Sequence, residues 1–328
     1  MMMMSDSEMN QSYLFSKYTF GSKIGEGSFG CVWKAFDNHS DEIVAIKVLK
    51  DKVYSSEEAR NLRELKLLDE IEHPNIVQLK EVLGEDGVLY LVFEYMDSSL
   101  GKVIRDRGVK DRFFSEIEIR NYCFQILKGL DYMHKNGWFH CDLKPDNILV
   151  SGDLIKLADL GSAQEFLSNT PYEEYITTRW YRAPEVLLYS EYGSAIDMWA
   201  MGAIMAELFL LCPLFPGDCG NNQLYRICTI MGSPDDVSWV GESAKYYRFP
   251  QFQRTSFDMI MTGVSEDAID LMTSLLSWNP SKRPTTVEAL RHPFFKSCYE
   301  VQKLPCQSTG PPMALGSTRG AVQVQLVV

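Results

Sequence analysis

The sequence predicts an α+β fold with two lobes, in which a small sheet-rich lobe with one main helix precedes a larger, mostly helical lobe. Three observations predict this division. Residues 18–95 contain short runs of β-branched and aromatic residues, separated by turn formers and interrupted by one segment with helical spacing. After residue 97, long apolar segments follow a helical period instead. The chain of 328 residues is also too long for one small domain and suits two lobes.

The first lobe is expected over residues 18–96, after a disordered leader at residues 1–17. The segment Gly84-Glu85-Asp86-Gly87 predicts a hairpin of the longer-loop type between its last two strands. The expected elements of this lobe are strands around a glycine-rich turn at 18–49, a helix at 57–72, and strands at 76–83 and 88–95.

The second lobe is expected over residues 97–295, followed by a short flexible tail at 296–328. A long irregular stretch at 161–185 predicts a functional loop, because such loops in compact domains usually serve function. The other expected elements are a helix at 117–136, a polar loop at 140–147, short strands at 148–150 and 155–157, and helices over 197–295.

Composition limits the possible partners and the compartment. The net charge of −12 argues against nucleic acid as the main partner, since phosphate binding needs a basic surface. It fits basic peptide substrates, although an acidic surface that serves solubility is the plainer explanation. The eight cysteines form no C-x-x-C pair and no secretory signal is recognisable, so we expect reduced thiols and an intracellular location. We expect no membrane span, because the longest apolar stretch, 198–215, contains Glu207 and Pro213.

The polar loop at 140–147, His-Cys-Asp-Leu-Lys-Pro-Asp-Asn, holds a carboxylate, an ammonium group and an amide at fixed offsets. Asp142 can accept a hydroxyl proton, Lys144 can meet a phosphate oxygen, and Asn147 can bind a magnesium ion. Asp159, at the end of a predicted strand and before Leu160-Gly161, suits a second magnesium ligand on a mobile hinge. Alone, this Asp-Leu-Gly segment could be a plain turn.

A glycine string at residues 25–32, Gly-Glu-Gly-Ser-Phe-Gly-Cys-Val, predicts a phosphate-binding turn. A dinucleotide-binding fold uses a similar string, but there a helix follows at once, whereas here a strand-like run follows. A further strand then carries Lys47, and Glu64 interrupts the apolar face of the next helix. Lys47 could reach solvent from an edge strand. The paired interruptions favour an ion pair between Lys47 and Glu64 that serves nucleotide phosphates.

With these motifs in order, the chain resembles the eukaryotic protein kinases over about residues 18–295. The segment 178–185, Thr-Arg-Trp-Tyr-Arg-Ala-Pro-Glu, and Leu214-Phe215-Pro216-Gly217 are similar to the CMGC group. Gly161-Ser162 with Pro171-Tyr172 looks most like its RCK branch, the MAK- and MOK-like kinases, which stand near the MAP kinases. The other matching motifs are the glycine string, Val44-Ala45-Ile46-Lys47, Glu64, the polar loop, Asp159-Leu160-Gly161, Asp197-Met198-Trp199 and Arg283.

This resemblance implies a two-lobed protein kinase fold with ATP and Mg²⁺ in its cleft, and transfer of the γ-phosphoryl group to Ser or Thr, preferably before Pro. It implies a catalytic set of Asp142, Lys144, Asn147, Lys47, Glu64 and Thr178, with Asn147 and Asp159 holding Mg²⁺. It implies nucleotide contacts from Ile24, Gly25, Glu26, Gly27, Ser28, Phe29, Gly30, Val32, Ala45, Lys47, Phe93 as gatekeeper, Glu94, Met96 and Leu149. Arg283 is expected to pair with Glu185 as a structural contact. The expected partners are protein substrates, and we expect a monomer in the cytoplasm or nucleus, with a ciliary or flagellar location implied by the branch alone.

Three departures from the family pattern are linked. Where the family has an arginine before the catalytic aspartate, this chain has Cys141. Glu173 stands in place of the phosphorylated threonine, and Gln164 stands in place of a second phosphate-binding arginine. A carboxylate carries less charge than a phosphate and needs fewer arginines, so we hypothesise that Arg63 pairs with Glu173 without phosphorylation. Relaxed selection, with Glu173 merely solvated, is the alternative.

Tyr175 differs from Glu173, because Arg179 and Arg182, which the family uses to hold a phosphotyrosine, are both present. We therefore expect Tyr175 to be phosphorylated, although an exposed loop tyrosine is the plain alternative. The departures also support a competing hypothesis, a pseudokinase that binds ATP and partners as a scaffold. Against it, every residue expected to touch ATP, Mg²⁺ or the hydroxyl group is present. A redox or metal role for Cys141 is disfavoured, because no second ligand or basic activator is visible.

Overall fold

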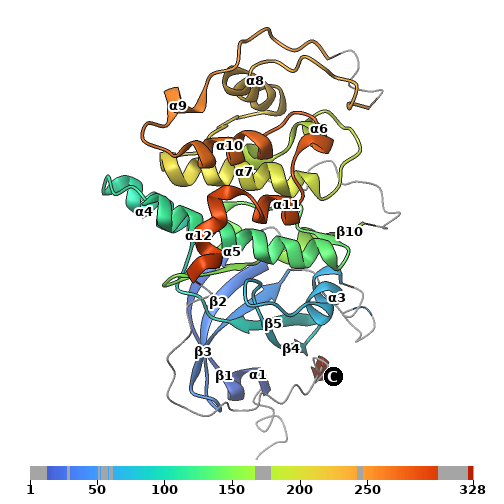
Figure 1. Cartoon of the computed structure of the whole chain (residues 1–328). Coiled ribbons are helices and arrows are strands. Elements are labelled where there is room, and N and C mark those ends of the chain that lie inside the picture. The colour runs from blue at the N-terminus through green and yellow to red at the C-terminus, as the bar shows by residue number, and fades with distance from the viewer. Residues whose placement is uncertain are drawn as a thin grey trace, which may run out of the picture. The chain divides into compact units, whose positions relative to one another are not determined.

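The structure is a computed structural model that describes residues 13–27, 30–50, 52, 58, 62–166, 179–241, 247–301 and 324–327. The chain divides into two compact units (Figure 1). The sheet unit comprises Met1–His73, Val77–Met96 and Gly310–Val328, and the helical unit comprises Pro74–Ile76 and Asp97–Thr309. The predicted two-lobed α+β fold is confirmed, with a β-sheet lobe and a helical lobe.

The sheet unit is built on one sheet with the strand order β1-β2-β3-β5-β4-β11. All neighbouring strands are antiparallel except β11, which pairs in parallel with β4. The elements are α1 (Tyr13–Lys17), β1 (Tyr18–Glu26), β2 (Gly30–Asp37), β3 (Glu42–Leu49), α3 (Arg63–Glu70), β4 (Leu79–Glu85), β5 (Val88–Glu94) and β11 (Val324–Val327).

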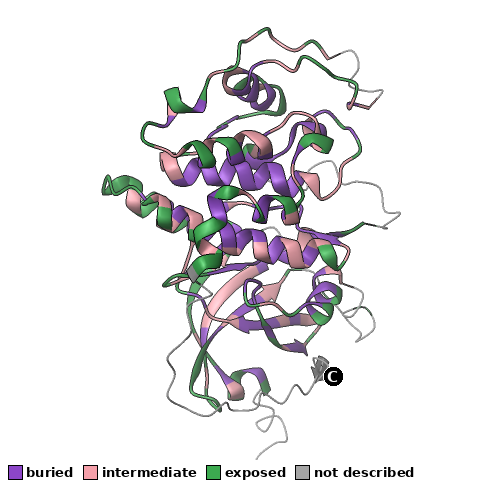
Figure 2. Cartoon of the chain, viewed as in Figure 1, coloured by how far each residue is buried: buried purple, intermediate pink, exposed green. Residues whose placement is uncertain are grey.

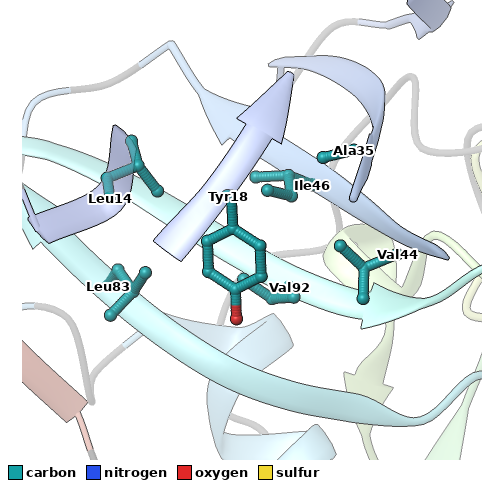
Figure 3. Packing of buried hydrophobic residues seen from close by; sticks show 7 residues of the cluster. All are labelled: Leu14, Tyr18, Ala35, Val44, Ile46, Leu83 and Val92. Carbon is teal, nitrogen blue, oxygen red and sulfur yellow. The ribbon is translucent and has the colours of Figure 1, made fainter. Parts of the chain in front are cut away.

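One apolar cluster joins most elements of this unit, and the ring of Tyr18 lies in its middle (Figure 3). It takes at least one buried side chain from α1 and from each of the strands β1–β5, namely Leu14, Tyr18, Ala35, Val44, Ile46, Leu83 and Val92. Residues 13–17 therefore form a helix where a disordered leader was expected, because Leu14, only 2% exposed, anchors that helix in the core.

The hairpin between β4 and β5 is tighter than predicted. Gly84 and Glu85 continue strand β4, and only Asp86 and Gly87 form the turn. Both turn residues have positive φ angles, 50° and 76°. Two such residues match the twist of the flanking strands, which explains why Asp-Gly joins them directly.

Among the described residues, the helical unit contains most of the helices and two small sheets, one of three short strands and one of two. Its helices are α4 (Leu100–Val109), α5 (Glu116–Lys135), α6 (Pro184–Leu187), α7 (Ala195–Leu210), α8 (Gly220–Met231), α9 (Phe257–Ile260), α10 (Glu266–Leu275), α11 (Thr286–Leu290) and α12 (Lys296–Val301). Its strands are β6 (Ser98–Ser99), β7 (Trp138–Phe139), β8 (Ile148–Ser151), β9 (Leu154–Leu157) and β10 (Gln164–Glu165).

Helices α5 and α7 form the centre of this unit. A capping box starts α5, in which Ser115 accepts from the backbone of Glu118 and Glu118 accepts from the backbone of Ser115. Every residue from Ile196 to Leu208 in α7 is buried, and Figure 2 shows this helix as a nearly continuous purple ribbon. The apolar stretch at 198–215 is thus largely a core helix. Among the residues that the structure describes, no helix is long and apolar enough to cross a bilayer.

Two segments of the expected flexible tail form secondary structure. Residues 296–301 are helix α12, whose Tyr299 ring packs against Phe124 of α5 with a centroid distance of 5.1 Å. Residues 324–327 are strand β11. The aromatic contact and the open edge of β4 supply the tertiary partners that local sequence patterns do not reveal.

Candidate functional site

The polar loop brings its three predicted groups together in the helical unit. Lys144 Nζ lies 2.6 Å from Asp142 Oδ2, and Asn147 Nδ2 lies 2.8 Å from the Asp142 carbonyl oxygen and 3.2 Å from Oδ2. Pro145 opens a short 3-10 helix that ends at Asn147, which turns the chain back on itself. The loop therefore presents one buried carboxylate that is held by a cation and an amide.

Asp197, in the first turn of α7, holds the backbone at the start of this loop. Its Oδ2 accepts from His140 N at 2.8 Å and contacts His134 Nε2 at 2.9 Å, and its Oδ1 accepts from Cys141 N at 3.1 Å. Cys141 has a positive φ of 68°, which an L-residue adopts only at a cost. The buried carboxylate stabilises this loop conformation. The sequence analysis assigned Asp197 no function, although it is one of only two charged residues in a helix that is otherwise largely apolar.

Asn75 is a second anchor that the sequence analysis missed. Its Nδ2 donates to the carbonyl oxygen of Ile155 at 2.9 Å, and its own carbonyl oxygen accepts from Leu157 N at 2.8 Å. It thereby braces β9, the strand that leads into Asp159. A polar residue in the loop between a helix and a strand gave no distinct signal for this contact.

The donor set near Asp159 fits a magnesium ion. Ala158 N donates to the carbonyl oxygen of Asn147 at 2.9 Å. Asp159 follows Ala158 directly, so the backbones of the two predicted ligands lie close together. Asn147 uses Nδ2 in both of its side-chain hydrogen bonds, which leaves the amide oxygen to face a cation. Mg²⁺ is bound by one or two carboxylate or amide oxygens, with phosphates and water completing its shell. Among the described residues no group of three His, Cys, Asp or Glu side chains could hold a metal by itself.

In the sheet unit, the predicted ion pair between Lys47 and Glu64 is confirmed. Lys47 Nζ lies 2.9 Å from both carboxylate oxygens of Glu64, and both side chains are only 9% exposed. The pair joins strand β3 to helix α3. Burial of two charges is costly unless they are paired, so Glu64 fixes the position of the Lys47 ammonium group.

The strand register brings several predicted nucleotide-binding residues together. Val32 lies opposite both Gly25 and Lys47, and Ala45 lies opposite Phe93. A Cβ atom on Gly30 would stand 2.2 Å from the carbonyl oxygen of Val48, so only glycine permits this close approach of β2 and β3. Of the other predicted contacts of this unit, the described residues are Ile24, Glu26, Gly27, Glu94 and Met96, whereas Ser28 and Phe29 lie outside the described residues. Leu149 lies in β8 of the helical unit.

Neutral groups occupy the positions where the family has two phosphate-binding arginines. Cys141 is 1% exposed and its Sγ lies 3.7 Å from the carbonyl oxygen of Phe139. Gln164 is 5% exposed, and its Nε2 donates to Tyr192 Oη at 3.3 Å. These two side chains therefore offer no positive charge to a phosphate.

The other predicted regulatory residues are only partly within the described chain. Arg179 Nη1 donates to the carbonyl oxygen of Asp218 at 2.5 Å, Arg182 is buried, and Arg63 begins α3. Thr178, Glu173 and Tyr175 lie outside the described residues, so their expected contacts stay predictions.

The predicted structural pair of Arg283 and Glu185 is confirmed. The guanidinium group makes two hydrogen bonds to the carboxylate, at 2.6 and 2.7 Å, and both side chains are at most 1% exposed. Arg283 also donates to the carbonyl oxygens of Ala195, Ser277 and Trp278. It thus ties the start of α6 to the start of α7 and to the loop after α10.

Comparison with known families decides what this arrangement belongs to. A family model described as "Protein kinase domain" matches residues 18–295. The chain belongs to the protein kinase family. Its relatives place it in the RCK branch of the CMGC group.

Three kinase relatives illustrate this placement. Cyclin-dependent kinase F-4 of Oryza sativa subsp. japonica is 52% identical over 282 residues, which cover 84% of this chain and 61% of that protein. Serine/threonine-protein kinase MAK of Homo sapiens is 45% identical over 86% of this chain and 46% of its own length. Serine/threonine-protein kinase ICK of Mus musculus is 43% identical over 90% of this chain and 49% of its own length. The kinase chain thus spans about half to three fifths of these relatives.

A buried carboxyl group in this kinase is expected to make its stability depend on pH. Tyr181 Oη donates to Glu207 Oε2 at 2.6 Å. Burial raises the pKa of Glu207 from 4.5 to about 7, although the hydrogen bond from Tyr181 acts in the opposite direction. A raised carboxyl pKa favours the folded state while the group is protonated. The contribution of Glu207 to the free energy of unfolding is therefore complete below pH 4.5 and is lost as the pH rises through about 7.

Glu207→Gln removes this titration and keeps an acceptor for Tyr181. We expect the unfolding free energy of the variant, relative to the unchanged kinase, to increase between pH 5 and pH 8 by roughly 1–3 kcal/mol. Urea unfolding at several pH values measures this difference, with the exposed substitution Asp153→Asn as the control. A difference that is constant with pH would contradict the role of Glu207.

Proposed function

We propose that this chain is a serine/threonine protein kinase that transfers the γ-phosphoryl group of ATP to protein substrates. A protein kinase domain implies ATP as substrate and, in general, Mg²⁺. One observation carries the proposal, namely the convergence of Lys144 and Asn147 on the carboxylate of Asp142. Kinase relatives that are named serine/threonine-protein kinases support it.

Each group has one task in the proposed reaction. Asp142 orients the substrate hydroxyl group and accepts its proton as the oxygen attacks the γ-phosphorus atom. The new oxygen–phosphorus bond forms, the bond from the γ-phosphorus to the bridging oxygen of ADP breaks, and ADP leaves with that electron pair. Lys144 neutralises negative charge on the transferred group. Most of the rate enhancement then comes from positioning and electrostatics.

The sheet unit serves the nucleotide in this proposal. Lys47, held by Glu64, contacts the α- and β-phosphates, and the glycine string offers backbone amides to the phosphates. Asn147 and Asp159 would hold Mg²⁺, which would offset the negative charge of the phosphates. Thr178 is proposed to hydrogen-bond near Asp142 and Lys144.

We further propose that the substrate residue is followed by proline. The segment 178–185 and the group of its relatives support this preference. Paired peptides that differ only in Ser-Pro against Ser-Ala test it, with γ-phosphate transfer measured with and without Mg²⁺. We expect transfer that requires Mg²⁺ and is at least about tenfold faster for Ser-Pro, equivalent to roughly 1.4 kcal/mol in transition-state binding.

The same assay separates the proposed function from its competitor. Equal rates for both peptides would contradict the proline preference and leave the kinase activity standing. Binding of MgATP without any transfer would contradict the activity and favour a pseudokinase scaffold. Neither the intracellular location nor the monomeric state is tested by this assay, and both stay predictions.

We also infer that Glu173 supplies a fixed negative charge that pairs with Arg63 in place of a phosphorylated threonine. Cys141 and Gln164 are neutral where the family has arginines, and this supports the inference. The carboxylate of Glu173 carries a smaller negative charge than a phosphate and needs fewer positive partners. Phosphorylation of Tyr175 is a separate proposal, supported by the presence of Arg179 and Arg182.

Glu173→Ala is expected to lower the transfer rate of the phosphatase-treated kinase by about tenfold, as the loss of one charge-assisted hydrogen bond of roughly 1.5 kcal/mol predicts. The neighbouring substitution Glu174→Ala removes the same charge one residue away and is the matched control. Single-turnover transfer to the Ser-Pro peptide is the measurement. Equal rates for both variants and the unchanged kinase would show that the pairing has no role.

A further inference from the structure

The outer edge of strand β4 is covered by the distant C-terminal segment of the same chain. Strand β11 pairs with β4 in parallel, in the register Val324 to Val82, Gln325 to Leu83, Leu326 to Gly84 and Val327 to Glu85. Figure 1 shows β11 beside β4, close to the mark at the C-terminus. Strand β11 is thus the sixth strand of the sheet and forms its edge.

Strand β4 is apolar where β11 pairs with it. Val82 is 0% exposed and Leu83 is 3% exposed, and Gly84 is also buried. Edge strands in soluble proteins are normally protected by charges, proline, bulges or a cover, because their unpaired backbone groups recruit other strands. Between Val82 and Gly84 strand β4 carries neither a charge nor a proline. Among the described residues, the cover supplied by β11 therefore protects this part of the edge.

The segment that fills the edge has the composition of a docking strand. Residues 321–328 read Ala-Val-Gln-Val-Gln-Leu-Val-Val, with valine or leucine alternating with glutamine over 322–326 and no charge or proline. This period of two and the β-branched residues are typical of a strand. Extended peptides with these properties bind to sheet edges by adding a strand, where backbone hydrogen bonds supply much of the affinity.

The elements that receive this segment share one apolar cluster. The cluster around Tyr18 takes side chains from α1 and the strands β1–β5, so these elements are joined by a core of their own (Figure 3). The last described residue before β11 is Val301, which ends α12. Residues 302–323 connect α12 to β11. The entropy cost of closing such a connection grows only with the logarithm of its length, so this long connection costs little more to close than a shorter one.

We propose that the outer edge of β4, at Val82–Glu85, is a docking site for an extended, uncharged, β-branched segment, and that residues 324–327 of the same chain occupy it in cis. The occupant binds in parallel through its backbone. Docking closes the sheet edge and prevents a second chain from pairing with it. This proposal concerns a surface apart from the transfer reaction and stands whether or not the chain is an active kinase.

Hydrogen–deuterium exchange of the full chain tests the proposal. In a β-strand successive amides point to opposite sides, so the β4 amides at 82–85 divide into those facing β5 and those facing β11. The double substitution Val324→Pro and Gln325→Pro removes two donors and disfavours the strand. We expect the amides facing β11 to exchange at least about tenfold faster in this variant, while those facing β5 keep their protection. The matched control is Gln325→Thr, which keeps the backbone donors and is expected to exchange like the unchanged chain.

A peptide with the sequence of residues 320–328 completes the test. Added to the proline variant, it is expected to bind saturably and to restore protection of the same β4 amides, whereas a peptide of the same composition in scrambled order is not. Unchanged exchange in the proline variant would overturn the proposal. Loss of protection on both sides of β4 would also overturn it, because the strand would then be part of the fold and no separable occupant. Protection that depends on chain concentration would assign the occupant to a second copy and contradict docking in cis.

Discussion

The substitution Asp142→Asn is expected to lower phosphoryl transfer by about 10²- to 10⁴-fold, the range that a positioned proton acceptor contributes. Asparagine keeps the shape of the side chain but cannot accept the hydroxyl proton, and it removes the negative partner of Lys144. The residues proposed to hold ATP are unchanged, so we expect the affinity for MgATP to stay close to that of the unchanged kinase. Single-turnover transfer to the Ser-Pro peptide and calorimetric titration with MgATP measure the two effects separately.

The control for this prediction is Asp153→Asn, which removes an exposed carboxylate from the turn between β8 and β9. It is expected to transfer at the rate of the unchanged kinase. Full transfer by the Asp142 variant would contradict the proposed proton acceptor. A parallel loss of MgATP affinity would mean that the loop itself had changed, and then the role of Asp142 would have to be structural.

The second large effect is expected for stability. Arg283→Met should lower the free energy of unfolding by about 3–5 kcal/mol, because it leaves the buried charge of Glu185 without its partner. It also removes the donors to three backbone carbonyl groups, at Ala195, Ser277 and Trp278. Denaturant unfolding followed by circular dichroism measures the change. At a low temperature, where the variant is still folded, we expect it to keep most of its transfer activity.

An exposed pair with similar geometry provides the matched control. Two guanidinium nitrogens of Arg105 each lie 3.1 Å from Oδ1 of Asp146, but the side chains are 63% and 54% exposed. Arg105→Met should therefore cost at most about 1 kcal/mol. The double substitution Arg283→Met with Glu185→Leu should be more stable than Arg283→Met alone, because no unpaired charge remains. Equal losses for the buried and the exposed variants would show that desolvation is not the cause.

The parts of the site that could be predicted from the sequence are those where a charge interrupts an apolar pattern. Lys47 on a strand and Glu64 on a helix were predicted to pair, and the structure joins them at 2.9 Å. The offsets of Asp142, Lys144 and Asn147 were likewise sufficient to predict their convergence, because a short loop with a proline allows few arrangements.

The supports of the site could not be predicted in the same way. Asp197 acts on His140 and Cys141 across more than 50 positions, and a hydrogen bond over that separation leaves no periodic pattern in the sequence. Asn75 acts on β9 in the same non-local manner.

The ends of the fold show the same limit. Strand β11 has a readable alternation, but a strand of four residues forms only where a sheet edge accepts it, and that edge lies more than 200 positions away in the sequence. Helix α1 also depends on a partner, since Leu14 is buried among strands that follow it in the chain. The predicted loop length of the hairpin after β4 was wrong for a local reason, because Gly84 is a typical turn former but continues the strand here.

The contacts of Asp197 have a consequence for how this kinase can diverge in evolution. The carboxylate binds the amide groups of residues 140 and 141, and every amino acid except proline offers that amide. A replacement of Cys141 that tolerates a φ of 68° and fits this buried position therefore keeps both hydrogen bonds, and glycine would adopt that angle without strain. The hydrogen bonds from the amides of residues 140 and 141 to Asp197 thus do not depend on the side chain at position 141. The amino acid at position 141 can therefore change in evolution while Asp197 still holds the backbone that precedes Asp142.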